Sequence, residues 1–95
     1  MPVNELIARR LVVRGRVQGV GYRNYLEYKA GQLGVKGWVR NRRDGSVEAI
    51  VQGSLAAIAE IIECAKRGPR AAEVSTVEIS NSEDEYDSFN VRSTE

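Results

Sequence analysis

The sequence predicts an α+β sandwich, in which two helices cover one face of a small sheet. Three features indicate it. Segments with alternating apolar residues are interspersed with two segments whose apolar residues recur every three or four positions. Their order is strand, helix, strand, strand, helix, strand, and no repeat or linker interrupts it. With 95 residues, 42% of them hydrophobic and 28% charged, residues 1–95 are expected to form a single domain.

The first strand is expected over Ile7–Arg14, where β-branched and apolar residues are frequent, and Gly15 is expected to end it. A helix follows the next loop, because apolar residues at helical spacing share one face: Tyr22, Tyr25, Leu26, Ala30 and Leu33. Gly34 is expected to cap this helix in a left-handed conformation.

Two further strands are expected over Val35–Asn41 and Ser46–Gln52, where apolar residues alternate again. The Asp44-Gly45 pair between them is typical of a hairpin turn. These strands therefore form a β-hairpin.

Ser54 is expected to cap the second helix, and Gly68-Pro69 is expected to end it. The apolar face of this helix is predicted to contain Leu55, Ile58, Ile62 and Ala65, with Cys64 away from its centre. Val77 and Ile79 indicate a fourth strand, and Phe89 and Val91 a possible fifth, after an acidic loop.

A ferredoxin-like β-α-β-β-α-β arrangement, with an antiparallel sheet of four to five strands and two helices on one face, fits this order. In it the first and second strands run parallel, with the third antiparallel between them. The ends of those two strands lie at the same edge of the sheet. Arg23 and Asn41 are therefore expected to lie close together.

The stretch "GRVQGVGYR", Gly15 to Arg23, leads from the first strand into the first helix. Its glycines permit positive φ, and consecutive backbone N–H groups at a helix N-terminus bind a phosphate. Arg23 can add a bidentate contact to phosphate oxygens. The spacing G-x-x-x-G-x-G matches neither the P-loop nor the dinucleotide fingerprint, so a plain structural turn stays open as an alternative.

Charge is divided unevenly along the chain. Residues 1–45 contain ten Lys or Arg and three acids, a balance of +7, and residues 46–95 contain four and ten, a balance of −6. This points to an anionic ligand bound by the first half, although solvated surface charge explains it too.

The composition excludes several kinds of chemistry. There is no histidine, Cys64 is the one cysteine, and the acidic run 83–87 lacks the spacing of a calcium loop. Glu5, Glu27 and Asp44 are the acids of the first half. No metal and no strong catalytic base are therefore expected.

An enzyme built this way needs a phosphate with a leaving group that requires no protonation. An acyl phosphate fits, because its carboxylate leaving group has a pKa of about 4. Backbone N–H groups and Arg23 would stabilise the transferring phosphoryl group, and the Asn41 amide would orient the attacking water. Alternatively, Asn41 simply favours the hairpin turn that follows it.

The motifs "GRVQGVGYR" and "GWVRNRRDGSVE", with "GPRAAEV" at residues 68–74, resemble the acylphosphatase family over about residues 8–92. The resemblance implies a ferredoxin-like enzyme that hydrolyses acyl phosphates to a carboxylate and inorganic phosphate without a metal or cofactor. It implies that Arg23 is the phosphate-binding catalytic arginine and Asn41 the water-orienting asparagine. The family's backbone cradle corresponds to Val17, Gln18, Gly19, Val20, Gly21 and Tyr22.

Two other functions are compatible with the predicted fold. One is an RNA-recognition module, although the first and third strands contain no aromatic residue for base stacking. The other is an acylphosphatase-like domain that only binds anions or serves a larger enzyme. We expect instead a cytoplasmic monomer that binds small acyl phosphates and inorganic phosphate, with neither nucleic acid nor a membrane as partner.

Overall fold

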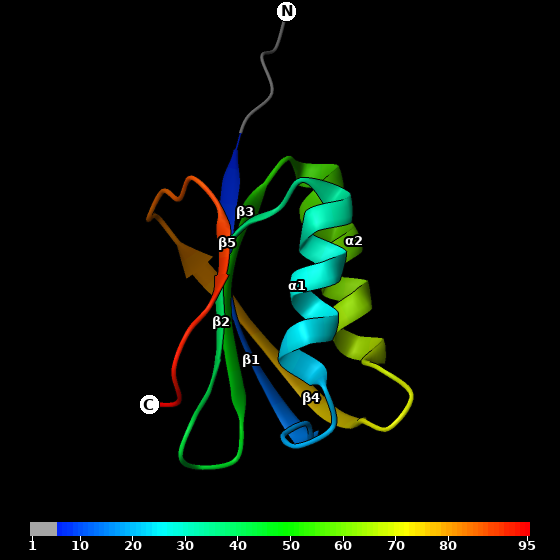
Figure 1. Cartoon of the computed structure of the whole chain (residues 1–95). Helices are drawn as coiled ribbons and strands as arrows, with labels where there is room; N and C mark the ends of the chain where they lie inside the picture. The colour runs from blue at the N-terminus through cyan, green and yellow to red at the C-terminus, as the bar shows by residue number, and fades with distance from the viewer. Residues whose placement is uncertain (1–5) are drawn as a thin grey trace, which may run out of the picture.

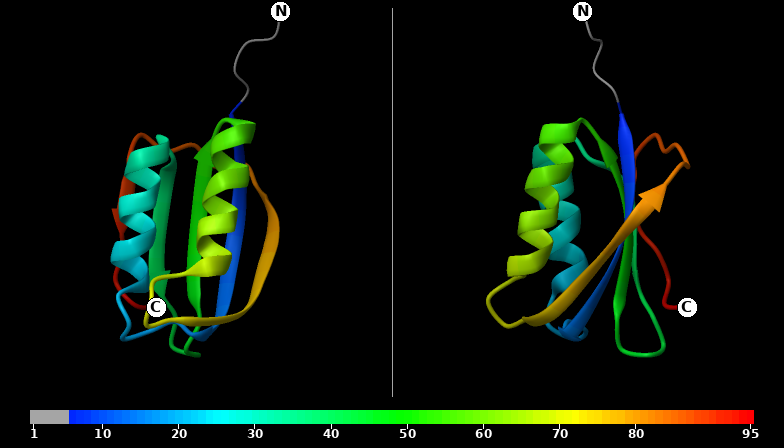
Figure 2. Two further views of the ribbon diagram at one scale, coloured as in Figure 1. Left: turned by 90° about the vertical axis from the view of Figure 1, so that its right-hand side faces the viewer. Right: turned by 180° about the vertical axis from the view of Figure 1, so that it is seen from behind.

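The computed structural model describes residues 6–95. Five strands form one sheet in the order β4-β1-β3-β2-β5. The strands are β1 (Ile7–Arg16), β2 (Lys36–Asn41), β3 (Val47–Gly53), β4 (Glu73–Ser82) and β5 (Phe89–Val91). The helices α1 (Tyr22–Leu33) and α2 (Leu55–Arg67) both cover one face of the sheet, as Figures 1 and 2 show.

The predicted topology is confirmed, with one correction. β1 pairs antiparallel with β3 and β4, and β2 pairs antiparallel with β3, so β1 and β2 run parallel on either side of β3. β5 instead pairs parallel with β2, which makes the sheet mixed. The reason is the long connection from β4, which crosses the face away from the helices and returns to the opposite edge (Figure 2, right).

The core lies between the sheet and the helices. It is built from alternate residues of the strands and from one face of each helix. Its largest fully buried side chains are Tyr22, Leu11, Leu26, Ile61, Val13, Val17, Val39, Val47 and Val51.

The first helix begins and ends at the expected residues. Gly21 precedes it and Gly34 caps it, both in the left-handed region, and the Gly34 N–H donates to the Ala30 carbonyl. For the second helix, the Ser54 hydroxyl accepts a 3.2 Å hydrogen bond from the Ala57 N–H. These caps confirm the predicted boundaries.

The predicted apolar face of α2 is wrong at two positions. Leu55 is 71% exposed, whereas Cys64 is 4% exposed. The helix is rotated about its axis so that Ile58, Ile61 and Ala65 lie at the centre of the buried face. Cys64 lies beside them, and Leu55 at the first turn projects past the edge of the core.

Gly15 does not end the first strand. It lies within β1, opposite Val74, where the register between β1 and β4 shifts at a bulge. Its φ is 127°, and a Cβ there would lie 2.2 Å from the carbonyl oxygen of Glu73. Gly15 is therefore required for the close approach of two strands rather than for the approach of a ligand.

Candidate active site

The loop at residues 17–21 joins β1 to α1 at one end of the sandwich (Figure 1). Gly19 and Gly21 have φ values of 74° and 81°, in the left-handed region that favours glycine. Within residues 6–95, no backbone N–H of residues 18–21 donates to a backbone carbonyl. These N–H groups are therefore available to a ligand.

The first turn of α1 adds to the positive character of this loop. No side chain caps the helix N-terminus, and no acidic residue lies in the first turn. The unsatisfied N–H groups and the positive end of the helix dipole are therefore compensated by no carboxylate. Arg23, in the same turn, adds a full positive charge. Such a combination favours a bound anion.

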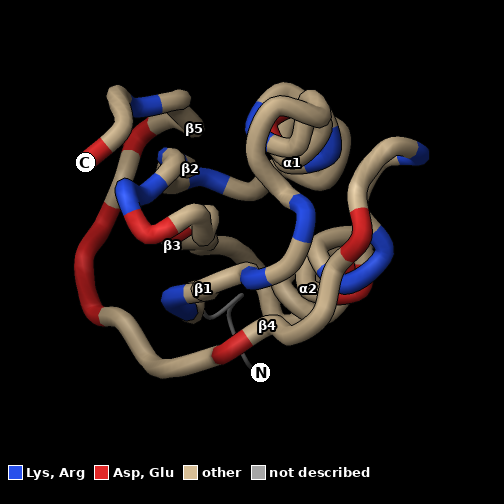
Figure 3. Tube along the Cα trace, turned by 90° about the horizontal axis from the view of Figure 1, so that it is seen from below, with Lys and Arg blue, Asp and Glu red and all other residues tan. Residues whose placement is uncertain are grey.

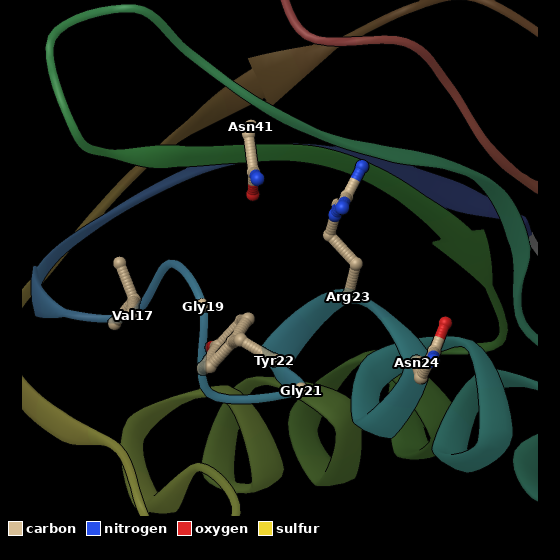
Figure 4. A pocket seen from close by; sticks show the side chains of 7 residues that line it. All are labelled: Val17, Gly19, Gly21, Tyr22, Arg23, Asn24 and Asn41. Carbon is tan, nitrogen blue, oxygen red and sulfur yellow. The ribbon is translucent and has the colours of Figure 1, made fainter.

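Asn41 is the residue that the sheet contributes to this site. It is the last residue of β2 and pairs with Val47 of β3. In Figure 4 the Arg23 side chain extends from α1 and the Asn41 side chain from β2 toward the same space, above the loop. The expectation that parallel β1 and β2 bring these residues to one edge agrees with this arrangement.

A cavity of about 100 Å³ lies between the loop, the helix and the strand. Its lining includes most of the predicted site, namely Val17, Gly19, Gly21, Tyr22, Arg23 and Asn41, together with Asn24. Drug-sized pockets measure roughly 300 Å³ or more, so this cavity can enclose a single small group.

Two predicted cradle residues do not line the cavity. The side chain of Val20 packs against the hydrophobic core. That of Gln18 turns toward the β2–β3 hairpin and donates to the carbonyls of Arg42 and Ser46. Gln18 and Val20 therefore contribute backbone groups, and not side chains, to the loop beside the cavity.

The Tyr22 side chain has a structural place. Its ring is 1% exposed, and its hydroxyl donates a 2.7 Å hydrogen bond to the Ala65 carbonyl. Burial raises the pKa of this hydroxyl well above its ordinary value, with smaller contributions from Tyr25 and Cys64. Tyr22 therefore stays protonated and supplies no base.

Asn24 also lines the cavity, although it was not among the predicted site residues. It directly follows Arg23 in the first turn of α1. Its position in the sequence could have indicated a place in the site, because the first turn of a helix surrounds any ligand bound at that N-terminus. In Figure 4 its side chain extends from α1 on the side of Arg23 that lies away from Asn41.

Arginines surround this end of the molecule. Figure 3 looks onto it and shows basic positions on the loop into α1 and on the β2–β3 hairpin. The nearby carboxylate of Asp44 is occupied: it accepts from the N–H and hydroxyl of Ser46 at 2.9 and 2.6 Å. These hydrogen bonds, together with the charges of Arg14 and Arg42, lower its pKa to about 2.

Within residues 6–95, no group of three or more His, Cys, Asp or Glu side chains is placed so that it could hold a metal ion. The described residues also form no helix long and apolar enough to span a membrane.

The model of the acylphosphatase family matches residues 9–91. The chain belongs to the acylphosphatase family. An acylphosphatase of Thiobacillus denitrificans is 52% identical over 83 residues, which are 87% of this chain and 93% of that relative. The structure of an acylphosphatase from Coxiella burnetii has a TM-score of 0.90 and 33% identity, and the match covers 97% of this chain and 100% of the other. Acylphosphatases are hydrolases that act on acyl phosphates.

The acylphosphatase fold also occurs within a larger protein. Full-length HypF, in a phosphate- and nucleotide-bound form, matches with a TM-score of 0.89 and 28% identity. The match covers 98% of this chain and 13% of HypF.

Proposed function

We propose that this chain hydrolyses the carboxyl–phosphate bond of acyl phosphates by in-line attack of a water molecule. The products are a carboxylate and inorganic phosphate. The observation that carries the proposal is the convergence of Arg23, Asn41 and the glycine loop on one small cavity.

The loop and Arg23 are proposed to hold the phosphoryl group. The N–H groups of residues 18–21 and of the first turn of α1 would donate to its oxygens, and the Arg23 guanidinium would form a bidentate contact. Phosphoryl transfer spreads negative charge over the equatorial oxygens, so these donors stabilise the transition state more than the ground state.

Asn41 is proposed to orient the water. Its carboxamide is a neutral donor and acceptor, so it can hold a water in line without removing its proton. The water oxygen bonds to phosphorus while the bond from phosphorus to the acyl oxygen breaks. The carboxylate leaves unprotonated, because its pKa is about 4, and the proton of the water passes to a phosphate oxygen.

This scheme needs no general base, and the hydrogen bonds of Tyr22, Asp44 and Glu48 agree with that. Tyr22 uses its hydroxyl in a buried hydrogen bond, and Asp44 binds Ser46. Glu48 accepts from Arg10 and Arg40 at 2.7 and 2.9 Å. None of these groups is available to accept a proton from water.

The size of the cavity supports broad tolerance of the acyl part. About 100 Å³ accommodates a phosphoryl group, and the remainder of a substrate would extend into solvent. Few contacts would then distinguish one acyl group from another.

An RNA-binding function has less support. The face of the sheet away from the helices has one aromatic ring on β2, Trp38, which is 7% exposed. The guanidinium carbons of Arg40 and Arg92 lie 4.8 and 4.6 Å from the centre of this ring. A base could stack on Trp38 only after displacing both arginines.

We further infer that the chain acts as a single cytoplasmic domain and as a monomer, without a metal, a cofactor, nucleic acid or a membrane. The large exposed apolar residues support the monomer, because they are scattered over different parts of the chain: Leu6, Tyr28, Leu55, Ile79 and Val91.

The test is hydrolysis of benzoyl phosphate by the purified chain with a chelator present, beside the Arg23→Ala variant. We expect rapid hydrolysis that survives the chelator, is inhibited competitively by inorganic phosphate, and is lost with Arg23. A folded protein that binds phosphate but does not hydrolyse benzoyl phosphate would instead be an anion-binding domain.

A further inference from the structure

The side chain of Gln18 connects the glycine loop to the β2–β3 hairpin. Its amide nitrogen donates to the carbonyl of Arg42 at 2.7 Å and to the carbonyl of Ser46 at 2.8 Å. Both N–H bonds of the carboxamide are thus used, and the side chain is partly buried. In residues 6–95, no other side-chain hydrogen bond joins residues 17–21 to residues 42–46.

The two acceptors are the ends of the hairpin turn. The N–H of Arg42 donates to the Ser46 carbonyl at 2.8 Å, and the N–H of Gly45 donates to the Arg42 carbonyl at 3.1 Å. Gln18 therefore binds a turn that is already closed by its own hydrogen bonds. Arg42 directly follows Asn41, so a restraint on the Arg42 carbonyl acts one residue from the Asn41 backbone.

The topology makes this connection necessary. β1, which leads into the loop, and β2, which ends at Asn41, are not neighbours, because β3 lies between them. Without the Gln18 contact, the distance between the loop and Asn41 would be set through the β1–β3 and β3–β2 pairings and through α1. A hydrogen-bonded contact across the mouth of the site fixes it directly.

We propose that Gln18 is a positioning residue, whose side chain sets the distance between the phosphate-binding loop and Asn41. It touches neither substrate nor water through its side chain. It holds the Asn41 carboxamide in register with the bound phosphoryl group, so that the water lies in line with the breaking bond. This inference rests on the water-orienting role proposed for Asn41.

The role predicts a separation of kinetic effects. Gln18→Met keeps the length of the side chain and removes both donors. Because misplacement of a reacting group by about 1 Å costs up to about 100-fold in rate, we expect kcat for benzoyl phosphate to fall about 10- to 100-fold. The inhibition constant for inorganic phosphate should stay within about twofold, because the loop backbone and Arg23 are intact.

Gln52→Met is the matched control. Gln52 is 6% exposed, and it binds the Asp84 carbonyl and the Tyr86 N–H at 3.5 and 2.9 Å. It thus makes two bonds to backbone at the other end of the sheet. We expect Gln52→Met to lower the thermal midpoint and leave kcat unchanged. If Gln18→Met does not fold, Gln18→Ala is measured in the same way.

A double-mutant cycle distinguishes positioning from a general effect. In the Asn41→Ala background, Gln18→Met should reduce kcat by less than about threefold. An equal loss in both backgrounds, an unchanged kcat in Gln18→Met alone, or a parallel loss of kcat and phosphate inhibition would each overturn the inference. Full kcat in Asn41→Ala would instead refute the proposed role of Asn41, and the inference with it.

Discussion

The hydroxyl of Tyr22 donates a 2.7 Å hydrogen bond to the backbone carbonyl of Ala65 and so joins the first turn of α1 to the last turns of α2. The Tyr25 hydroxyl makes a similar contact and donates a 2.7 Å hydrogen bond to the neighbouring carbonyl, that of Cys64. The turn that carries Arg23 is therefore anchored to the second helix at two points.

Tyr22→Phe should lower the free energy of unfolding by about 1–2 kcal/mol, because it leaves the Ala65 carbonyl without a partner in a buried setting. The hydrolytic rate at saturating substrate should change little. Urea unfolding followed by circular dichroism measures the first quantity. Tyr28→Phe is the control, because Tyr28 is 64% exposed, and it should alter neither value.

Asn41→Ala should lower kcat by about 100-fold or more, with little change in inhibition by phosphate, because water orientation is lost while the phosphate site remains. Steady-state hydrolysis of benzoyl phosphate with phosphate as competitor gives both values. A variant that keeps full kcat would show that Asn41 serves only the hairpin turn.

Gly15→Ala should be strongly destabilising, by about 2–4 kcal/mol, since the new Cβ would lie 2.2 Å from the Glu73 carbonyl oxygen at a φ of 127°. Gly31→Ala is the opposite case. Gly31 lies on α1, and a Cβ there would meet no atom from beyond its own helical turn within 4 Å, so alanine should stabilise the protein by up to about 1 kcal/mol. Thermal unfolding of both variants tests these two predictions, and equal changes in stability would contradict them.

Glu48→Gln should cost about 1–3 kcal/mol of stability, because the 6% exposed side chain of Glu48 has three arginines around it. Arg10, Arg40 and Arg42 lie 2.7, 2.9 and 3.4 Å from its carboxylate. Without that charge they repel one another. Chemical denaturation should show the loss, and the loss should shrink at high salt.

Stability should fall as the pH is lowered from about 4 to about 2, in part because of Asp44. Its pKa lies near 2 in the folded protein, against an ordinary 3.8, so the folded state favours the ionised form. The contribution is complete above the ordinary pKa and disappears as pH falls through the folded one. Asp44→Asn should flatten this part of the pH profile in urea unfolding; an unchanged slope would refute it.

Much of the fold could be predicted because its signals are local. Alternation, helical spacing, the Ser54 cap and the Asp44-Gly45 turn each depend on a few neighbouring residues. The convergence of Arg23 and Asn41 followed from topology, since parallel strands end at one edge of a sheet.

The rest depended on contacts between distant segments. The bulge at Gly15 arises from the approach of β4, and the parallel pairing of β5 from a connection that crosses the sheet. The burial of Cys64 reflects how α2 is rotated on the sheet rather than its own pattern. The hydrogen bonds of the Gln18 side chain to the hairpin could not be predicted either, because no sequence spacing indicates them.

The pairing of β1 with β3 and with β4, two strands from distant parts of the chain, has a consequence for the kinetics of folding. Arg14 of β1 and Glu78 of β4 form an ion pair although they are 64 positions apart in the chain, so loop closure over most of the molecule precedes such contacts. Proteins dominated by non-local pairing fold in milliseconds to seconds, slowly for their size. Because the loop and Asn41 meet only across an assembled β1-β3-β2 unit, recovery of hydrolysis during refolding should lag behind helix formation and report completion of the sheet.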